Sequence, residues 1–218
     1  MTALRWETGP KKKCVWPECV ASATAMVLCR VMTMREHPSN IVLIGMPGAG
    51  KSTVGAMLAR LTCRGFVDTD VLIQTSEGRS LQDIVDASGY LALRAVEERV
   101  ILGLTVHNSV IATGGSAVYS NAAMAHLKKD GIVVFLSVTL RTLGSRVSDL
   151  ATRGLAKRPD QNISDLFAER FSLYGQYADV VLACDDLTHE EVCAAIINVL
   201  RAGDRTADLS ANRGERTP

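Results

Sequence analysis

The segment GMPGAGKST, residues 45–53, combines residue types that could bind a phosphate group. Gly45, Gly50, Lys51 and Ser52 fit the pattern G-x-x-x-x-G-K-[ST], in which backbone N–H groups surround a phosphate because no side chain fills the space. An apolar run precedes the motif and a helical pattern follows it, so the positive end of a helix would face the same phosphate. We therefore expect Lys51 to neutralise the β- and γ-phosphates of ATP, and the Ser52 hydroxyl to bind Mg²⁺.

The other residues of this loop would hold the nucleotide through their backbone. The nucleotide-binding residues expected from the motif are Gly45, Gly48, Ala49, Gly50, Lys51, Ser52 and Thr53. A glycine-rich turn between a strand and a helix, without a ligand, is the alternative. The cation and the hydroxyl at the expected positions favour phosphate binding.

Two carboxylates stand at the end of the next expected strand. Asp68 and Asp70 follow the apolar residues of FVDTD, and in a parallel sheet ligands bind beyond the carboxyl ends of the strands. One acid could hold Mg²⁺, and the other could take the proton of a substrate hydroxyl. Alternatively, Asp68 and Thr69 could only cap the following helix. We expect Asp68 to be the metal ligand and Asp70 to be the acid that acts on the substrate.

The elements that would position these residues alternate along residues 40–201. Short β-rich runs predict strands at 40–45, 65–70, 109–115, 131–138 and 179–184. Helical periodicity and capping pairs predict helices at 51–61, 80–87, 90–107, 120–129, 139–149, 163–178 and 188–201. Such alternation is typical of βαβ units around a mostly parallel sheet with helices on both faces. Residues 150–161 show no apolar period and are expected to form a mobile lid.

Composition limits the partners and the organisation of the chain. The 218 residues carry a net charge of +1, which gives no electrostatic basis for binding nucleic acid or an anionic membrane. Scattered cysteines favour a reducing, cytoplasmic compartment. Residues 1–38 are expected to be a poorly ordered extension, or alternatively a targeting segment that would direct the chain to an organelle. Residues 39–202 would form the catalytic domain, and 203–218 a disordered tail.

Six segments in this order and spacing resemble shikimate kinases. They are GMPGAGKSTVG, FVDTD, GRSLQDI, LRAVEERV, ATGGSAV and RFSLYGQYAD, and together they span about residues 40–200. The resemblance implies a three-layer αβα P-loop kinase fold with a five-stranded parallel sheet in the order 2-3-1-4-5. It also implies a monomer that transfers the γ-phosphoryl group of ATP to the 3-hydroxyl of shikimate with Mg²⁺, in aromatic amino-acid biosynthesis.

The resemblance also implies roles for particular residues. Arg94 and Arg170 would hold the substrate carboxylate, with Glu97 orienting Arg94, while Gly114 and Gly115 would approach the substrate ring. Nucleotide contacts would come from Arg146, near the adenine, and from Arg153, a lid arginine that closes over the transferred phosphoryl group. Catalysis would fall to Asp70, Lys51 and Arg153. His189, by contrast, is expected to face solvent at a helix end.

Four positions depart from the family pattern. Ser116 replaces a third glycine, Gly154 a lid proline, Leu93 a phenylalanine, and Tyr90 an acidic residue. The charged contacts to the substrate are kept while the contacts that shape the pocket change. A kinase of another small hydroxylated carboxylic acid therefore remains an alternative on the same fold. A nucleotide-binding regulatory module without turnover is a further alternative, which the presence of Asp70, Arg94 and Arg153 disfavours.

Overall fold

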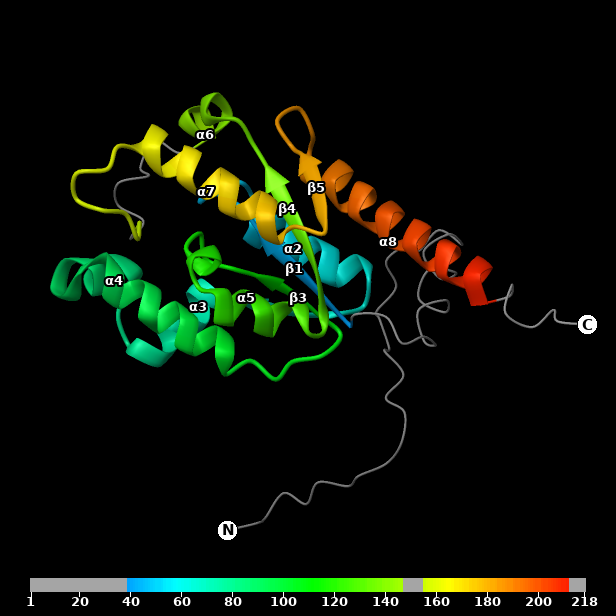
Figure 1. Cartoon of the computed structure of the whole chain (residues 1–218), viewed down its shortest axis with the longest axis horizontal. Coiled ribbons are helices and arrows are strands. Elements are labelled where there is room, and N and C mark those ends of the chain that lie inside the picture. Colours follow the sequence, from blue (N-terminus) through cyan, green and yellow to red (C-terminus); the bar gives the residue numbers. More distant parts are fainter. Residues whose placement is uncertain (1–38, 147–154, 212–218) are drawn as a thin grey trace, which may run out of the picture. The chain divides into compact units, whose positions relative to one another are not determined.

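A computed structural model of the chain describes residues 39–146 and 155–211, although nothing is described of the side chains of Arg146 and of residues 203–211. Five parallel strands form one sheet in the order β2-β3-β1-β4-β5, as expected, with helices packed around it (Figure 1). The strands are β1 (Asn40–Ile44), β2 (Gly65–Asp68), β3 (Ser109–Ala112), β4 (Gly131–Ser137) and β5 (Val180–Ala183). The helices are α2 (Lys51–Leu61), α3 (Thr69–Glu77), α4 (Leu81–Leu102), α5 (Asn121–Lys128), α6 (Leu140–Arg146), α7 (Ile163–Tyr177) and α8 (His189–Ala211).

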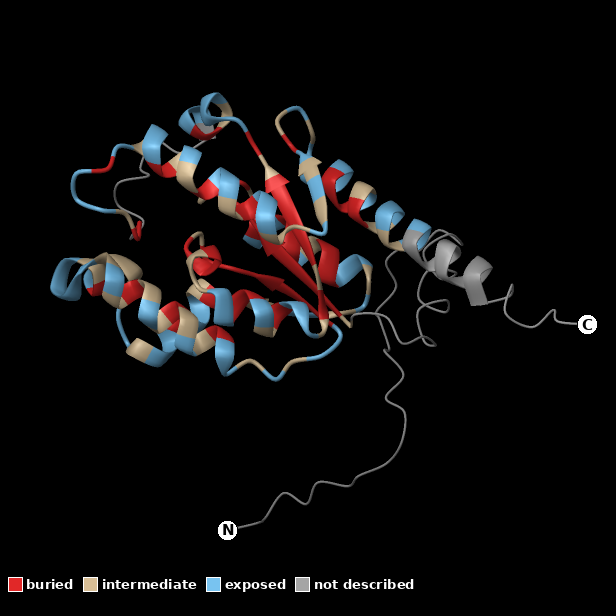
Figure 2. Ribbon diagram, viewed as in Figure 1, coloured by how far each residue is buried: buried red, intermediate tan, exposed pale blue. Residues whose placement is uncertain are grey.

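The hydrophobic core lies along the central strands. Every residue of β1 and β3 is buried, whereas the edge strands β2 and β5 are partly exposed (Figure 2). This matches the sequence, because strands covered on both faces read as continuous apolar runs. β1 pairs with β3 on one side and with β4 on the other, so Val42 lies opposite both Ile111 and Val133. The phosphate-binding loop at residues 45–53, called the P-loop below, follows β1 and therefore begins in the middle of the sheet.

Side-chain caps start the helices where the sequence predicts them. Ser80 and Asp83 form a reciprocal capping box at the start of α4, and Thr188 and Glu191 do the same at α8. Ser120 accepts a hydrogen bond from Ala123 N at α5. These caps satisfy N–H groups that have no partner inside the helix, which explains why the starting points could be predicted.

The break expected between the helices at 80–87 and 90–107 is confirmed by a kink at Gly89, whose φ of +80° suits glycine, although both parts belong to α4. Several other boundaries are wrong. α4 ends at Leu102 rather than at 107. The strand expected at 65–70 ends at Asp68, and the helix α3 that follows it was not predicted. The short 3₁₀ helix η1 (Ala117–Tyr119) was not predicted. α8 continues to Ala211, so the tail expected from residue 203 begins too early. Residues 1–38 and 212–218, with the expectations that fall on them, lie outside the described residues.

Candidate active site

The P-loop joins β1 to α2 through a backbone that only glycine suits at its first position. Gly45 has a φ of +146°, and a Cβ there would lie 2.7 Å from the carbonyl oxygen of Leu136. Lys51, the first residue of α2, is buried, and its Nζ donates to Gly45 O at 2.8 Å and to Met46 O at 3.0 Å. Burial lowers the pKa of Lys51 to about 8, while the charge of nearby Asp70 opposes the change. Both hydrogen-bond acceptors of Lys51 Nζ are neutral carbonyl oxygens, so a bound phosphate would give the ammonium group an anionic partner.

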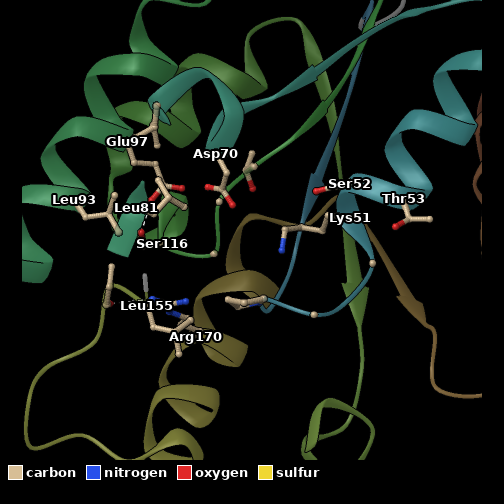
Figure 3. Close-up of a pocket in the computed structure, with 18 of the residues that line it drawn as sticks. Lys51, Ser52, Thr53, Asp70, Leu81, Leu93, Glu97, Ser116, Leu155 and Arg170 are labelled. Carbon is tan, nitrogen blue, oxygen red and sulfur yellow. Dashed lines mark hydrogen bonds between the residues drawn. The ribbon is translucent and has the colours of Figure 1, made fainter. Parts of the chain in front are cut away.

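A cavity of about 330 Å³ opens beside the P-loop at the carboxyl ends of the strands (Figure 3). Its lining joins the P-loop to residues from α3, α4, α7 and the turn after β3. The lining residues are Pro47, Gly48, Gly50, Lys51, Ser52, Thr53, Asp70, Ile73, Leu81, Leu93, Glu97, Thr113, Gly114, Gly115, Ser116, Leu155, Ala156, Arg170 and His189. Two described residues of the predicted acceptor and metal sites, Asp68 and Arg94, are not part of this lining.

The two acids after β2 have different surroundings. Asp68 is the N-cap of α3, where its Oδ1 accepts from Asp70 N at 3.0 Å and from Val71 N at 3.4 Å. Asp70 instead points into the cavity on the side opposite Arg170 (Figure 3). Burial raises the pKa of Asp70, and the charge of Lys51 partly offsets this effect. A carboxylate with a raised pKa accepts a proton more readily, which suits a general base.

Arg94 and Arg170 converge on one oxygen. The Nη2 atoms of Arg94 and Arg170 donate to Ala156 O at 3.1 Å and 2.9 Å, respectively. Arg170 is 1% exposed, and the guanidinium of Arg94 stacks 3.4 Å from the centre of the Tyr119 ring. The Nε atoms of both arginines are buried without a hydrogen-bond partner among the described residues. Together they form a two-arginine site with unused donors, as carboxylate binding requires.

The turn after β3 comes close to both acids of the cavity. A Cβ added at Gly114 would overlap Glu97 Oε1 and lie 2.6 Å from Asp70 Oδ1, so a larger residue there would displace these two carboxylates. Two residues that we did not predict hold this turn. Thr69 Oγ1 accepts from Gly114 N at 2.9 Å, and the buried Tyr174 donates to Gly115 O at 2.8 Å. Their partners lie far away in the sequence, so no local pattern indicated them.

Glu97 does not have the role that the family resemblance implied. Its Oε2 accepts a hydrogen bond from the Ser116 hydroxyl. The guanidinium of Arg94 instead stacks on the Tyr119 ring and donates to Ala156 O. Glu97 is 2% exposed, and burial raises its pKa to about 7 although the Ser116 hydrogen bond opposes this. The acid is therefore directed at the cavity rather than at Arg94.

His189 was expected to face solvent, yet it also borders the cavity. Its Nε2 lies 3.3 Å from the position that a Cβ on Gly50 would take, so it stands at the nucleotide side. Sequence offered no signal for this, because α8 reaches the P-loop only through packing against α2. Arg153 and Gly154 lie outside the described residues, and only the backbone of Arg146, the last residue of α6, is described.

The donor set fits a magnesium ion that is shared with a nucleotide. Ser52 lies in the first turn of α2 and lines the cavity, and Asp68 Oδ2 is not used by the cap of α3. Within residues 39–146 and 155–211, no three His, Cys, Asp or Glu side chains gather into a metal cage. Mg²⁺ commonly binds through one or two protein ligands together with phosphates and water. Ser52 and Asp68 could be those protein ligands.

The arrangement can join a phosphate donor to a hydroxylated acid. The P-loop and Lys51 can hold polyphosphate, Asp70 can take a hydroxyl proton, and the two arginines can fix a carboxylate.

Among the described residues, every helix is too short or too polar to span a lipid bilayer.

The sequence of the chain is similar to those of known proteins. Residues 47–201 match the family model described as shikimate kinase. Shikimate kinase 2 of Enterobacter sp. (strain 638) is 34% identical over 166 residues, which cover 74% of this chain and 95% of the relative. Shikimate kinase of Pasteurella multocida is 36% identical over 165 residues, with 74% and 94% covered.

Solved structures agree with the sequence relatives. The shikimate kinase of Acinetobacter baumannii in complex with shikimate superposes with a TM-score of 0.72 at 28% identity, covering 82% of this chain and 98% of that one. The shikimate kinase of Aquifex aeolicus gives a TM-score of 0.66 at 33% identity, with 76% and 98% covered. Because the family model matches most of the chain and relatives above 30% identity span nearly their full length, the chain belongs to the shikimate kinase family.

Proposed function

We propose that this chain transfers the γ-phosphoryl group of ATP to the 3-hydroxyl of shikimate. The product is shikimate 3-phosphate, an intermediate of chorismate and aromatic amino-acid biosynthesis. The observation that carries the proposal is the convergence of Arg94 and Arg170 on Ala156 O, at 3.1 Å and 2.9 Å, across the cavity from Asp70. A carboxylate oxygen of shikimate would take the place of that carbonyl, because a charged acceptor binds two guanidinium groups more strongly.

The residues around the cavity divide the reaction between them. Lys51 and the backbone of residues 45–53 hold the β- and γ-phosphates. Ser52 and Asp68 would hold Mg²⁺, which would neutralise the phosphate charge. Asp70 takes the proton of the attacking hydroxyl, since burial raises its pKa toward that of a useful base. Gly114 and Gly115 leave room for the ring of the acceptor. Residues 39–202 supply all these groups, which is consistent with activity as a monomer.

The arginines expected near the nucleotide complete the proposal. Arg153 would stabilise the charge on the transferred phosphoryl group, and Arg146 would lie near the adenine. Cationic groups that act on transition-state charge commonly have large effects on phosphoryl transfer. These two roles rest on the resemblance to the family.

The proposal is tested by measuring ADP release with ATP and a panel of acceptors that includes shikimate, quinate and gluconate. We expect release that depends on shikimate and that falls about 100- to 10,000-fold in Asp70→Asn, which removes the base. Asp86→Asn is the matched control, because Asp86 is an exposed acid on α4 bonded to Gln82. Absence of shikimate-dependent release at millimolar acceptor would refute the substrate, and full activity of Asp70→Asn would refute the role of Asp70.

A further inference from the structure

Ser116 and Glu97 form a buried pair that the transfer of the phosphoryl group does not use. Ser116 is 6% exposed and Glu97 is 2% exposed, and the Ser116 hydroxyl donates to Glu97 Oε2. Ser116 comes from the turn after β3 and Glu97 from the second half of α4, so the hydrogen bond ties two walls of the cavity together (Figure 3). The bond fixes the orientation of the carboxylate.

The second oxygen of this carboxylate is left without a partner. Glu97 Oε1 is buried and has no hydrogen-bond partner among the described residues. A buried acceptor without a donor is costly, because it has given up its hydrogen bonds to water. Since Glu97 lines the cavity, a donor on a bound molecule can satisfy this oxygen.

Glu97 Oε1 lies close to Asp70 Oδ1. A Cβ on Gly114 would overlap Glu97 Oε1 and lie 2.6 Å from Asp70 Oδ1, so both oxygens lie beside the same residue of the turn. Both side chains line the cavity, so two neighbouring donors of one bound molecule could reach the two carboxylates. Neighbouring hydroxyls on a ring are such a pair of donors.

We propose that Glu97, positioned by Ser116, accepts a hydrogen bond from the acceptor hydroxyl adjacent to the one that is phosphorylated. The inference rests on the proposed function, in which Asp70 acts on the attacking hydroxyl. It makes Glu97 a substrate-binding residue and Ser116 a positioning residue. It also restricts good acceptors to carboxylic acids with two neighbouring hydroxyls, because an acceptor with one would leave Glu97 Oε1 buried and unpaired.

The electrostatic surroundings of Glu97 act in both directions, and burial, the largest effect, raises its pKa to about 7. The Ser116 hydrogen bond lowers its pKa and so favours the carboxylate, the form that only accepts hydrogen bonds. Arg170 from α7 and Lys51 from α2 act in the same direction, whereas burial and the charge of Asp70 from α3 act against it. The Ser116 hydroxyl thus supports the accepting form of Glu97.

The test compares shikimate with an analogue in which the hydroxyl adjacent to the phosphorylated one is replaced by hydrogen. KM and kcat are measured for both acceptors in the wild type, Ser116→Ala, Ser116→Thr and Glu97→Gln. We expect Ser116→Ala and Glu97→Gln to raise KM for shikimate about tenfold, with kcat changed less than about threefold. With the analogue, the same substitutions should change KM less than about twofold, because the hydroxyl is already missing. Ser116→Thr keeps the hydroxyl and should restore most of the affinity.

A matched control separates this role from a general loss of packing. Ser109 is also buried on β3, at its opposite end, and donates to His107 O at 3.0 Å. Ser109→Ala removes a comparable hydroxyl and should leave KM for both acceptors unchanged. Equal losses with shikimate and with the analogue would overturn the proposal, as would a loss in Ser109→Ala equal to that in Ser116→Ala.

Folding and turnover are controlled separately. If Ser116→Ala does not fold, Glu97→Gln carries the same comparison between the two acceptors. A wild-type chain that does not turn over shikimate contradicts the proposed function. In that case calorimetric binding of shikimate and of the analogue, without turnover, still decides whether Glu97 binds the adjacent hydroxyl.

Discussion

The nucleotide half and the acceptor half of the cavity are built in different ways. The phosphate-binding part of the nucleotide half is one continuous segment, residues 45–53, although His189 of α8 also borders this half. The acceptor half takes side chains from α3, α4 and α7, and its contacts join distant residues, such as Arg170 with Ala156 and Tyr174 with Gly115. Local sequence therefore suffices for the first half, whereas the second depends on how the whole domain packs. Substitutions should be able to damage one half without the other.

The largest effect is expected from Lys51→Met, which removes the ammonium group of the nucleotide half. We expect kcat to fall about 100- to 1,000-fold, because a group aimed at transition-state charge is lost. Affinity for shikimate without ATP should change little. ADP release and calorimetric binding of shikimate measure the two effects, with Lys129→Met, an exposed lysine, as the control. A tenfold loss of shikimate affinity would show that the two halves cannot be separated.

Replacement of the arginines of the acceptor half should have a smaller effect, and it should change KM for shikimate instead of kcat. In Arg170→Lys the forked donor becomes a single ammonium, so KM for shikimate should rise about 30-fold while KM for ATP stays constant. Arg94→Lys should raise KM for shikimate less than Arg170→Lys does. Arg94 is half-buried and is not part of the cavity lining, whereas Arg170 lines the cavity and is 1% exposed. Steady-state kinetics with each substrate varied in turn measure KM for shikimate and KM for ATP separately.

The control for this comparison is Arg99→Lys, an exposed arginine of α4 that pairs with Glu77 at 2.5 Å. It should leave both KM values unchanged. An equal rise in KM for ATP and for shikimate in Arg170→Lys would contradict the division into two halves.

The smallest effect is a pH dependence of stability that belongs to the acceptor half. The pKa of Glu97 is about 7 in the folded chain, against 4.5 for an ordinary glutamate, so the folded state binds this proton more tightly than the unfolded state. The contribution of Glu97 to the free energy of unfolding therefore falls as the pH rises from about 4.5 to about 7. Above about pH 7 this contribution stays constant. In Glu97→Gln this loss disappears.

Chemical denaturation at about pH 5.5 and about pH 6.5 measures the difference. The wild type should lose on the order of 1 kcal/mol of unfolding free energy relative to Glu97→Gln between these two values. Glu98→Gln, the next residue along α4, serves as the control and should follow the wild type. A constant difference between the wild type and Glu97→Gln would show that Glu97 titrates like an exposed acid.

Local signals in the sequence determined much of the molecule. The apolar runs, the capping pairs Ser80–Asp83 and Thr188–Glu191, and the P-loop pattern were enough to predict five parallel strands, most helix boundaries and the phosphate site. Each of these features depends on residues a few positions apart, within one helical turn or one strand. Where local rules gave no signal, as at the start of α3 and the end of α8, the prediction was wrong.

Only the tertiary structure decided which partner each side chain of the acceptor half takes. Glu97 and Arg94 are neighbours on one helix, yet Glu97 turns to Ser116 and Arg94 to Tyr119 and Ala156. The residue types at 94, 97 and 116 could be read in the sequence, but the choice among possible partners depends on packing between elements far apart in the chain. Buried polar groups take the partners that the fold brings within reach, and that reach is a property of the assembled domain.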